Sequence, residues 1–161
     1  KNIITGNSKK IDGIRADSGK LILSSNTISS CSRAIILSSK VKGTVYPNTF
    51  KKNTYNNVKV NSSYVNTLTV KSLSGKSKSA KTATLNWKKL SSASGYVVYR
   101  SASKNGSYTK ISTIKKNKTI TYKDSKLKRK STYYYKIVPY TTIGKTTVYG
   151  LDSKIVSIKI K

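Results

Sequence analysis

The sequence predicts an all-β protein built in two parts. In the first third of the chain, short apolar segments recur at a fixed spacing, and each is too short for a helix of ordinary length. From about residue 67, strand-like segments rich in Val, Ile, Thr and Tyr follow one another at regular intervals, with turn residues between them. The 161 residues allow one or two domains, and the 35% of hydrophobic residues suffices for cores.

An internal repeat organises the first third of the chain. Turn-like asparagines recur, and each is followed by a pair of alternating apolar residues, with spacings of 19 to 23 residues. The asparagines are Asn7, Asn26 and Asn48, and the apolar pairs are Ile14/Ala16, Ile35/Leu37 and Val58/Val60. A period in the low twenties predicts a solenoid of stacked strands. The L-x-x-L-x-L pattern of leucine-rich repeats is missing.

The segments SSNTISSCSRAIILSS and GTVYPNTFKKNTYNNVKV resemble coils of right-handed parallel β-helix proteins, the pectate-lyase-like architecture. The resemblance covers residues 1–66 and implies that Asn26 and Asn48 stack as a ladder at a sharp turn, with Asn7 as a third rung. Asparagine suits such a turn because it tolerates left-handed backbone. Three coils are few for a solenoid, so we expect the C-terminal end of a longer one, with any catalytic surface upstream.

The pattern from residue 67 to residue 161 predicts an antiparallel β-sandwich. Residues 72–81 read as a lysine- and serine-rich loop. The expected strands are 68–70, 82–87, 96–100, 108–114, 118–122, 131–140, 146–149 and 154–160.

Four segments of this part resemble a bacterial fibronectin type III domain: ATLNWKKLSSASGYVVYR, NGSYTKI, TYKDSKLKRKSTYYYKIVPY and SKIVSIKI. The resemblance implies that Trp87 is the core tryptophan and that Leu127 is a buried leucine before the long strand. It also implies that the hydroxyl of Tyr133 closes a corner of the sandwich. The chain departs from the family at Arg129-Lys130, where the family usually has Pro-Gly or Lys-Gly.

The charge is strongly unbalanced, with 33 Lys and Arg against 4 Asp and a net charge of +29. Such a charge repels itself unless anions surround it, which indicates a polyanionic setting. Only four of the basic residues are Arg, and base reading relies on the guanidinium fork, so specific nucleic-acid binding is disfavoured. Teichoic acid or another anionic glycan or wall polymer is the favoured partner. A merely solvated lysine surface remains the alternative.

Three tyrosines are the candidate ligand contacts. Alternation along the strands places Tyr99, Tyr134 and Tyr140 on outward faces, with Val97 beside them and Tyr96 and Val98 facing the core. Their rings could stack on sugars, with nearby lysines attracting acidic groups. The alternative is that they are ordinary strand residues with exposed hydroxyls.

Nothing in the sequence indicates catalysis, a cofactor or a metal. There is no His and no Glu, and the single Cys31 reads as a small core residue. Asp12, Arg15 and Asp17 read as a loop ion pair, and no apolar run is long enough for a membrane span.

The sequence therefore predicts a non-catalytic structural and adhesion part of a secreted or wall-associated protein of a Gram-positive bacterium. One alternative is the accessory C-terminal region of a polysaccharide lyase or glycoside hydrolase whose catalytic coils lie upstream. Another is the subunit of an extracellular filament that self-associates through open coil ends.

Overall fold

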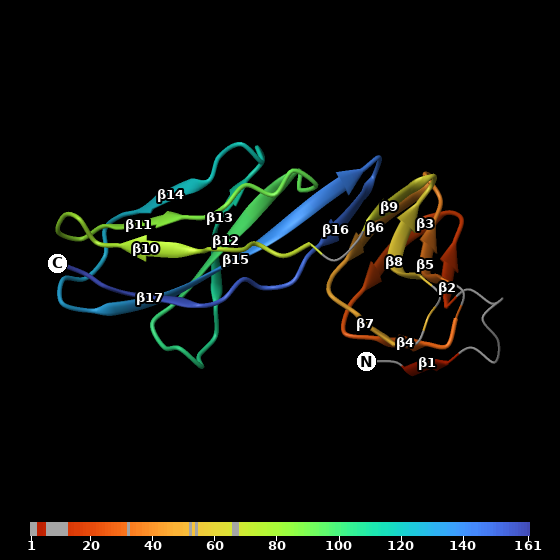
Figure 1. The fold of residues 1–161 in the computed structure, drawn as a ribbon, viewed down its shortest axis with the longest axis horizontal. Helices are drawn as coiled ribbons and strands as arrows, with labels where there is room; N and C mark the ends of the chain where they lie inside the picture. Colours follow the sequence, from red (N-terminus) through yellow and green to blue (C-terminus); the bar gives the residue numbers. More distant parts are fainter. Residues whose placement is uncertain (1–2, 6–12, 32, 52, 54, 66–67) are drawn as a thin grey trace. The chain divides into compact units, whose positions relative to one another are not determined.

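The structure, a computed structural model, describes residues 3–5, 13–31, 33–51, 53, 55–65 and 68–161. It divides into two compact units: unit 1 comprises Lys1–Leu68 and Thr141–Gly150, and unit 2 comprises Thr69–Tyr140 and Leu151–Lys161. All regular elements of the described residues are strands, which confirms the all-β prediction (Figure 1). None of them forms a helix that could span a membrane.

Unit 1 consists of short strands that pair in parallel with the strand one repeat further along the chain. One sheet has the order β1, β4, β7, a second has β2, β5, β8, and in a third β3 pairs with β6. The strands are β1 (Ile3–Thr5), β2 (Ile14–Ala16), β3 (Gly19–Leu23), β4 (Thr27–Ser29), β5 (Arg33–Leu37), β6 (Val41–Val45), β7 (Thr49–Lys51) and β8 (Tyr55–Val60).

The apolar pairs of the sequence repeat are register partners in these sheets. Ile35 pairs with Ile14 in β2 and with Val58 in β8, and Leu37 pairs with Ala16 and Val60 in the same way. Like residues therefore stack into columns that point to the interior, where the central pair is at most 1% exposed. Burial of such columns is the main source of stability of stacked strands.

The third repeat ends differently from the first two. After β8 the chain reverses at Asn61, whose φ of 54° is left-handed, and β9 (Ser63–Val65) pairs with β8 antiparallel. The free edge of β6 is instead occupied by β16 (Thr146–Tyr149), in which Val148 pairs in parallel with Val45 (Figure 1). The partner on this edge of β6 thus comes from about 100 residues further along the chain.

Side chains reinforce this pairing. Thr146 is 1% exposed, and its hydroxyl donates to the carbonyl oxygen of Val41 at 2.9 Å. The rings of Tyr149 and Tyr46 stack with centroids 5.0 Å apart and planes 7° from parallel. The sequence boundary after residue 66 lies close to the division at Leu68. Residues 141–150, however, were expected in the sandwich and group with unit 1, because β16 pairs with β6.

Unit 2 consists of antiparallel strands in two groups. Strand β11 lies between β10 and β14, and β12 lies between β13 and β15, with β17 on the other edge of β15. The strands are β10 (Ser74–Lys76), β11 (Ala83–Asn86), β12 (Gly95–Ser101), β13 (Thr109–Ile114), β14 (Thr121–Asp124), β15 (Thr132–Ile143) and β17 (Val156–Lys159). One hydrophobic core includes side chains of both groups, among them Leu85, Tyr96 and Tyr135.

Strand β10 was expected to be part of a loop, and that expectation is wrong. The segment Ser-Gly-Lys has no apolar side chain to show a period, so its pairing with β11 left no signal in the sequence. Gly75 allows the close fit, because a Cβ at this position would clash with Cδ1 of Ile158 and lie 2.9 Å from Cδ2 of Leu85. The segment 68–70, expected as a strand, forms only a single bridge from Thr69 to Leu151.

An ion pair in unit 2 joins the buried carboxylate of Asp124 to Arg100, whose side chain is 34% exposed. Asp124 is 6% exposed, and its Oδ2 accepts from Nη1 of Arg100 at 3.0 Å and from the hydroxyl of Tyr135 at 2.9 Å. Tyr135 itself is fully buried. Burial, followed by the charge of Asp124 and the hydrogen bond to it, raises the pKa of Tyr135. The arrangement satisfies a carboxylate that would otherwise be strongly destabilising.

We expect Thr146→Val to loosen the closing strand of unit 1. The valine fits the site but leaves the carbonyl of Val41 without its donor, at a cost of about 1–3 kcal/mol. Hydrogen exchange at the amides of β6 should become roughly 5- to 150-fold faster. Thr147→Val, whose hydroxyl lies at the surface near Thr142, is the matched control and should change exchange little. Equal effects of the two changes would contradict the proposed role of Thr146.

We expect Tyr135→Phe to destabilise unit 2 by about 1.5–3 kcal/mol at neutral pH, because it removes a hydrogen bond to a charged group. Since the pKa of Tyr135 is raised in the folded state, the folded protein retains this proton above pH 10 while the unfolded chain releases it. Above pH 10 the free energy of unfolding of the wild type therefore falls by up to about 1.4 kcal/mol per pH unit more than that of the variant.

The fluorescence of Trp87, the single tryptophan, reports urea unfolding of unit 2. The difference in free energy of unfolding between wild type and variant should be constant from pH 6 to pH 9 and then shrink. A difference that stays constant up to pH 12 would contradict this account of Tyr135.

Candidate binding surface

An aromatic surface lies on the side of β12 and β15 that faces away from the core of unit 2. Tyr99 of β12 pairs in register with Lys136 of β15, and Tyr134 pairs with Ser101. Register partners point to the same side of a sheet, and so do residues two apart on a strand, so Tyr99, Tyr134 and Lys136 share one face. Both tyrosines are half-buried.

Tyr108 joins this group, although sequence reasoning did not select it. It immediately precedes β13, the neighbour of β12, and its hydroxyl donates to the carbonyl oxygen of Lys104 at 3.0 Å. The ammonium nitrogen of Lys136 lies 4.8 Å from the ring centroid of Tyr108 and 5.7 Å from that of Tyr99. The pairing of β13 with β12 was the signal that could have found it. We call Tyr99, Tyr108, Tyr134 and Lys136 the tyrosine surface.

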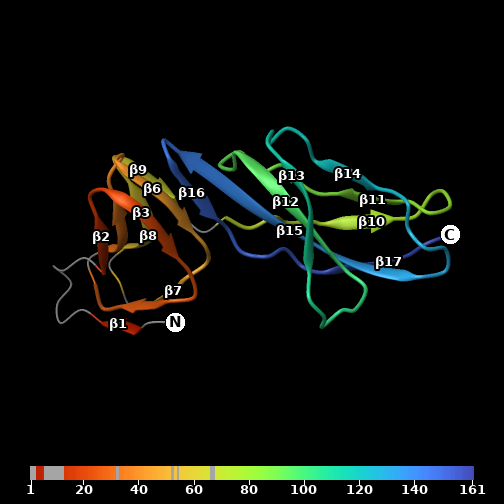
Figure 2. The same cartoon turned by 180° about the vertical axis from the view of Figure 1, so that it is seen from behind.

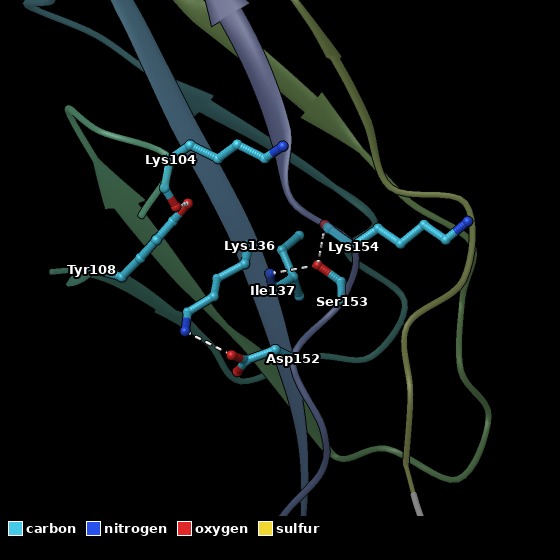
Figure 3. A network of polar contacts seen from close by, with 7 residues as sticks. All are labelled: Lys104, Tyr108, Lys136, Ile137, Asp152, Ser153 and Lys154. Atoms are coloured by element: carbon cyan, nitrogen blue, oxygen red, sulfur yellow. Dashed lines mark hydrogen bonds and ion pairs between the residues drawn. The ribbon is translucent and has the colours of Figure 1, made fainter. Parts of the chain in front are cut away.

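The charge of Lys136 is already compensated. Its ammonium nitrogen lies 2.6 Å from Oδ2 of Asp152 (Figure 3). The ring centroids of Tyr99 and Tyr108 lie within 5.7 Å of the same nitrogen. The side chain of Lys136 is 21% exposed and that of Asp152 is 54% exposed. An ion pair of this kind has little net attraction for a further anion. The tyrosine surface therefore offers ring faces and hydroxyls more than positive charge.

Backbone contacts hold Asp152 in place. The amide of Ser153 donates to the carbonyl oxygen of Ile137 at 2.9 Å. The hydroxyl of Ser153 accepts from the amide of Ile137 and donates to the carbonyl of Lys154, also at 2.9 Å (Figure 3). Ser153 is 6% exposed, so these bonds are shielded from water. They fix residue 152 beside β15, and its carboxylate can reach Lys136.

The pKa of the Tyr108 hydroxyl is raised above its ordinary value. Burial raises the pKa of Tyr108, Lys136 lowers it, and Tyr134 and Asp152 raise it. Burial also raises the pKa of Tyr140.

Tyr140 is not part of the cluster. It lies on the same strand four residues beyond Lys136, which is about 13 Å along an extended chain. It pairs with Gly95, where a Cβ would lie 2.7 Å from the Tyr140 hydroxyl. The structure thus brings together two of the three predicted contacts. Val97 was expected to face solvent on this side, but it is 2% exposed. Its register partner Val138 is also buried, so this face is exposed only in part.

The residues singled out as structural in the sandwich lie in or next to its core. Trp87 is 4% exposed and meets Tyr96 edge to face at 5.4 Å, and Leu127 is 3% exposed. The hydroxyl of Tyr133 accepts from the amide of Lys128 at 3.3 Å, and the guanidinium of Arg100 lies over its ring. In the adjacent turn Lys130 has a φ of 61°, the left-handed conformation that glycine adopts most easily.

The asparagines of unit 1 stack across repeats. Asn26, 6% exposed, donates from its backbone and side-chain nitrogens to Oδ1 of Asn48 at 2.9 and 3.0 Å, and Asn48 donates to the carbonyl of Tyr46. The left-handed residue of this turn is Ser25, with a φ of 54°, one place before the expected asparagine. Asn7 and Asp12 lie outside the described residues.

Sequence reasoning missed a second buried amide, Asn53. Its Oδ1 accepts from the amide of Cys31 and its Nδ2 donates to the carbonyl of Ile28, both at 2.9 Å. Asn53 stands one 22-residue repeat after Cys31, which is the signal that could have identified it. Cys31 is 1% exposed. Among the described residues no three His, Cys, Asp or Glu side chains come close enough to hold a metal ion.

No protein-family model and no curated protein matches the sequence. Solved structures do match, among them the FN1–FN3 domains of chicken CNTN1, with 17% identity, 65% of this chain and 34% of that chain covered, and a TM-score of 0.51. Unit 2 has the fibronectin type III fold.

Two further matches are a Fn3-like protein from Clostridium thermocellum and the sixth fibronectin type III domain of human fibronectin type III domain containing protein 3. The first is 30% identical over 56% of this chain and 88% of that one, with a TM-score of 0.47. The second is 19% identical over 60% and 87%, with a TM-score of 0.49. The chain spans about a third of the length of the CNTN1 fragment.

We expect Asp152→Asn to lower the pKa of Tyr108. The negative charge of Asp152 is one of the causes that raise this pKa, and its removal leaves burial and Tyr134 to raise the pKa and Lys136 to lower it. Titration of the Tyr108 ring signals by NMR measures the shift. Asp17→Asn in unit 1 removes the same charge from an exposed residue and is the control. A rise of the Tyr108 pKa in Asp152→Asn would show that the ion pair does not control this surface.

Proposed function

We propose that this chain is a non-catalytic structural and adhesion segment of a secreted or cell-surface bacterial protein. In this proposal residues 1–66 are coils of a right-handed parallel β-helix and residues 67–161 form the fibronectin type III domain. Residues 141–150 of that domain contribute β16, which pairs with the coil strand β6. The support for the coils is the parallel register of β1 to β8 together with the amide contacts of Asn26 and Asn48.

The adhesive contact in this proposal is the tyrosine surface, and its geometry is the observation that carries the proposal. The rings of Tyr99 and Tyr108 lie within 5.7 Å of one ammonium group, and Tyr134 shares a sheet face with Tyr99 and Lys136. Aromatic faces bind the C–H faces of sugars through dispersion, and hydroxyls and a lysine supply hydrogen bonds at the rim. The ligand class is a glycan, recognised chiefly by its rings and hydroxyls, since Asp152 neutralises the lysine.

The protein acts outside the cell in this proposal, on a Gram-positive wall. The excess of 33 basic over 4 acidic residues suits a setting rich in anionic wall polymers, which would screen the repulsion among lysines.

A glycan titration followed by NMR tests the proposal. Oligosaccharides of wall peptidoglycan, neutral and acidic, are added to the full chain, and we expect amide shifts confined to the tyrosine surface. Tyr108→Ala should weaken binding about 3- to 10-fold, which corresponds to the loss of one aromatic contact. Tyr108 is half-buried and lies outside the strands, immediately before β13.

The matched control is Tyr64→Ala, which removes an exposed tyrosine with Lys59 above its ring in unit 1. It should leave affinity unchanged. Binding that depends little on salt is expected, because the lysine charge is compensated. No shifts at Tyr99, Tyr108 and Tyr134 with any of these glycans would refute the adhesive role.

A further inference from the structure

Two loops of unit 2 carry a concentration of positive charge that the tyrosine surface does not use. The loop 77–82 joins β10 to β11, and the loop 125–131 joins β14 to β15. They contain six basic residues, all exposed, and neither an acid nor an aromatic residue. We call these six the basic pole: Lys78, Lys81, Lys126, Lys128, Arg129 and Lys130.

Backbone contacts tie the two loops and the C-terminal segment together. The amide of Leu127 donates to the carbonyl of Lys81 at 3.0 Å, and the amide of Lys130 donates to the carbonyl of Ile160 at 2.9 Å. The amide of Lys161 donates to the hydroxyl of Ser77 at 3.1 Å, which joins the C-terminal segment to the loop 77–82. Figures 1 and 2 show both loops beside the C-terminus at the same end of the sandwich. The six side chains therefore belong to one surface.

Three of these lysines occupy strained backbone. Lys81, Lys126 and Lys130 have φ angles of 60°, 61° and 61°, in the left-handed region where side chains with a Cβ are disfavoured. Glycine would relieve the strain at each place. Backbone strain of this kind clusters at functional sites, and the property that lysine adds over glycine at these three positions is charge.

No neighbouring acid compensates this charge in the part of the chain that the structure describes. Asp124, next to the second loop, is buried and bonded to Arg100 and Tyr135. Asp152 is paired with Lys136. Like charges at one end of a small domain repel one another, and a bound anion would remove that repulsion.

The chemistry of the pole selects the type of anion. Five of the six residues are lysines, which bind phosphate as point charges without the directional fork of arginine. Neither loop contains an aromatic ring on which bases could stack. We propose that the basic pole binds a linear, flexible chain of phosphate groups that carries no bases. This inference is independent of the tyrosine surface and supplies an anionic partner for the proposed adhesive role.

The experiment measures binding of the full chain to fluorescent poly(glycerol phosphate) and inorganic polyphosphate of matched phosphate number, from 50 to 300 mM salt. The test variant is Lys81→Gly/Lys126→Gly/Lys130→Gly. With a salt slope of about −0.7 per phosphate contacted, each contact contributes about fourfold at 0.15 M salt, so three lost contacts predict about 50-fold weaker binding. The slope itself should fall by about 2.

The same variant should unfold at an equal or higher urea concentration, as followed by Trp87 fluorescence, because the three glycines relieve strain. Lys115→Gly/Lys116→Gly/Lys118→Gly is the matched control, since it removes three exposed charges from the loop between β13 and β14. Its affinity should fall less than threefold. Tyr108→Ala should leave phosphate binding unchanged, which separates this inference from the role of the tyrosine surface.

Tighter binding of one phosphate polymer over the other would identify the source of the chain, and both results support the proposal. Wild-type affinity in the test variant would overturn it. Equal losses in test and control variants would also overturn it, because only the overall charge would then matter. A thymidine oligonucleotide of the same phosphate number that binds more tightly than either polymer would assign the pole to single-stranded nucleic acid instead.

Discussion

The outermost strand of a parallel stack exposes a row of backbone N–H and C=O groups, and unit 1 is organised by the need to pair them. Unpaired strand edges are sites of aggregation, and burying them without partners is costly. Strand β6 meets this need through β16, with Val45 opposite Val148 and the hydroxyl of Thr146 on the carbonyl of Val41. Strand β8 meets it through the antiparallel β9. Both pairings replace the parallel strand that a further repeat would have supplied.

This closure bears on the expectation that open coil ends drive self-association. In two of the three sheets of unit 1, the strand of the last repeat is followed by a partner from the same chain. Stacking of a second copy onto β6 or β8 would first require β16 or β9 to leave. A filament built through that end of the stack therefore has an internal competitor.

The parts that the sequence could predict are those with short-range signals. The 21- and 23-residue offsets that place Ile35 between Ile14 and Val58 are visible as a repeat, and the alternation around Tyr96 and Val98 is visible as a strand. What could not be predicted depends on long-range pairing. Strand β10 is held by its neighbour β11 and by the space that Gly75 leaves for Ile158. For β16, the local pattern indicates an ordinary strand of the sandwich and does not show that it pairs with β6.

The candidate site also depends on long-range pairing that local sequence patterns do not reveal. Alternation predicts that Tyr99 and Tyr134 face outward, but only the register brings Lys136 beside Tyr99. Only the Ser153 contacts bring Asp152 to that lysine. The charge of Lys136 is compensated by Asp152, and no local pattern could have revealed this pairing.

The origin of β16 also determines when unit 1 can be finished during synthesis. A ribosome makes β6 about 100 residues before β16, so most of unit 2 is translated while the edge of β6 still lacks its partner. Closing so long a connection is slow compared with forming the neighbouring repeats. The nascent repeats therefore remain incomplete until Thr146–Tyr149 is made, and translation that stops before this segment leaves the edge of β6 unpaired and prone to aggregation.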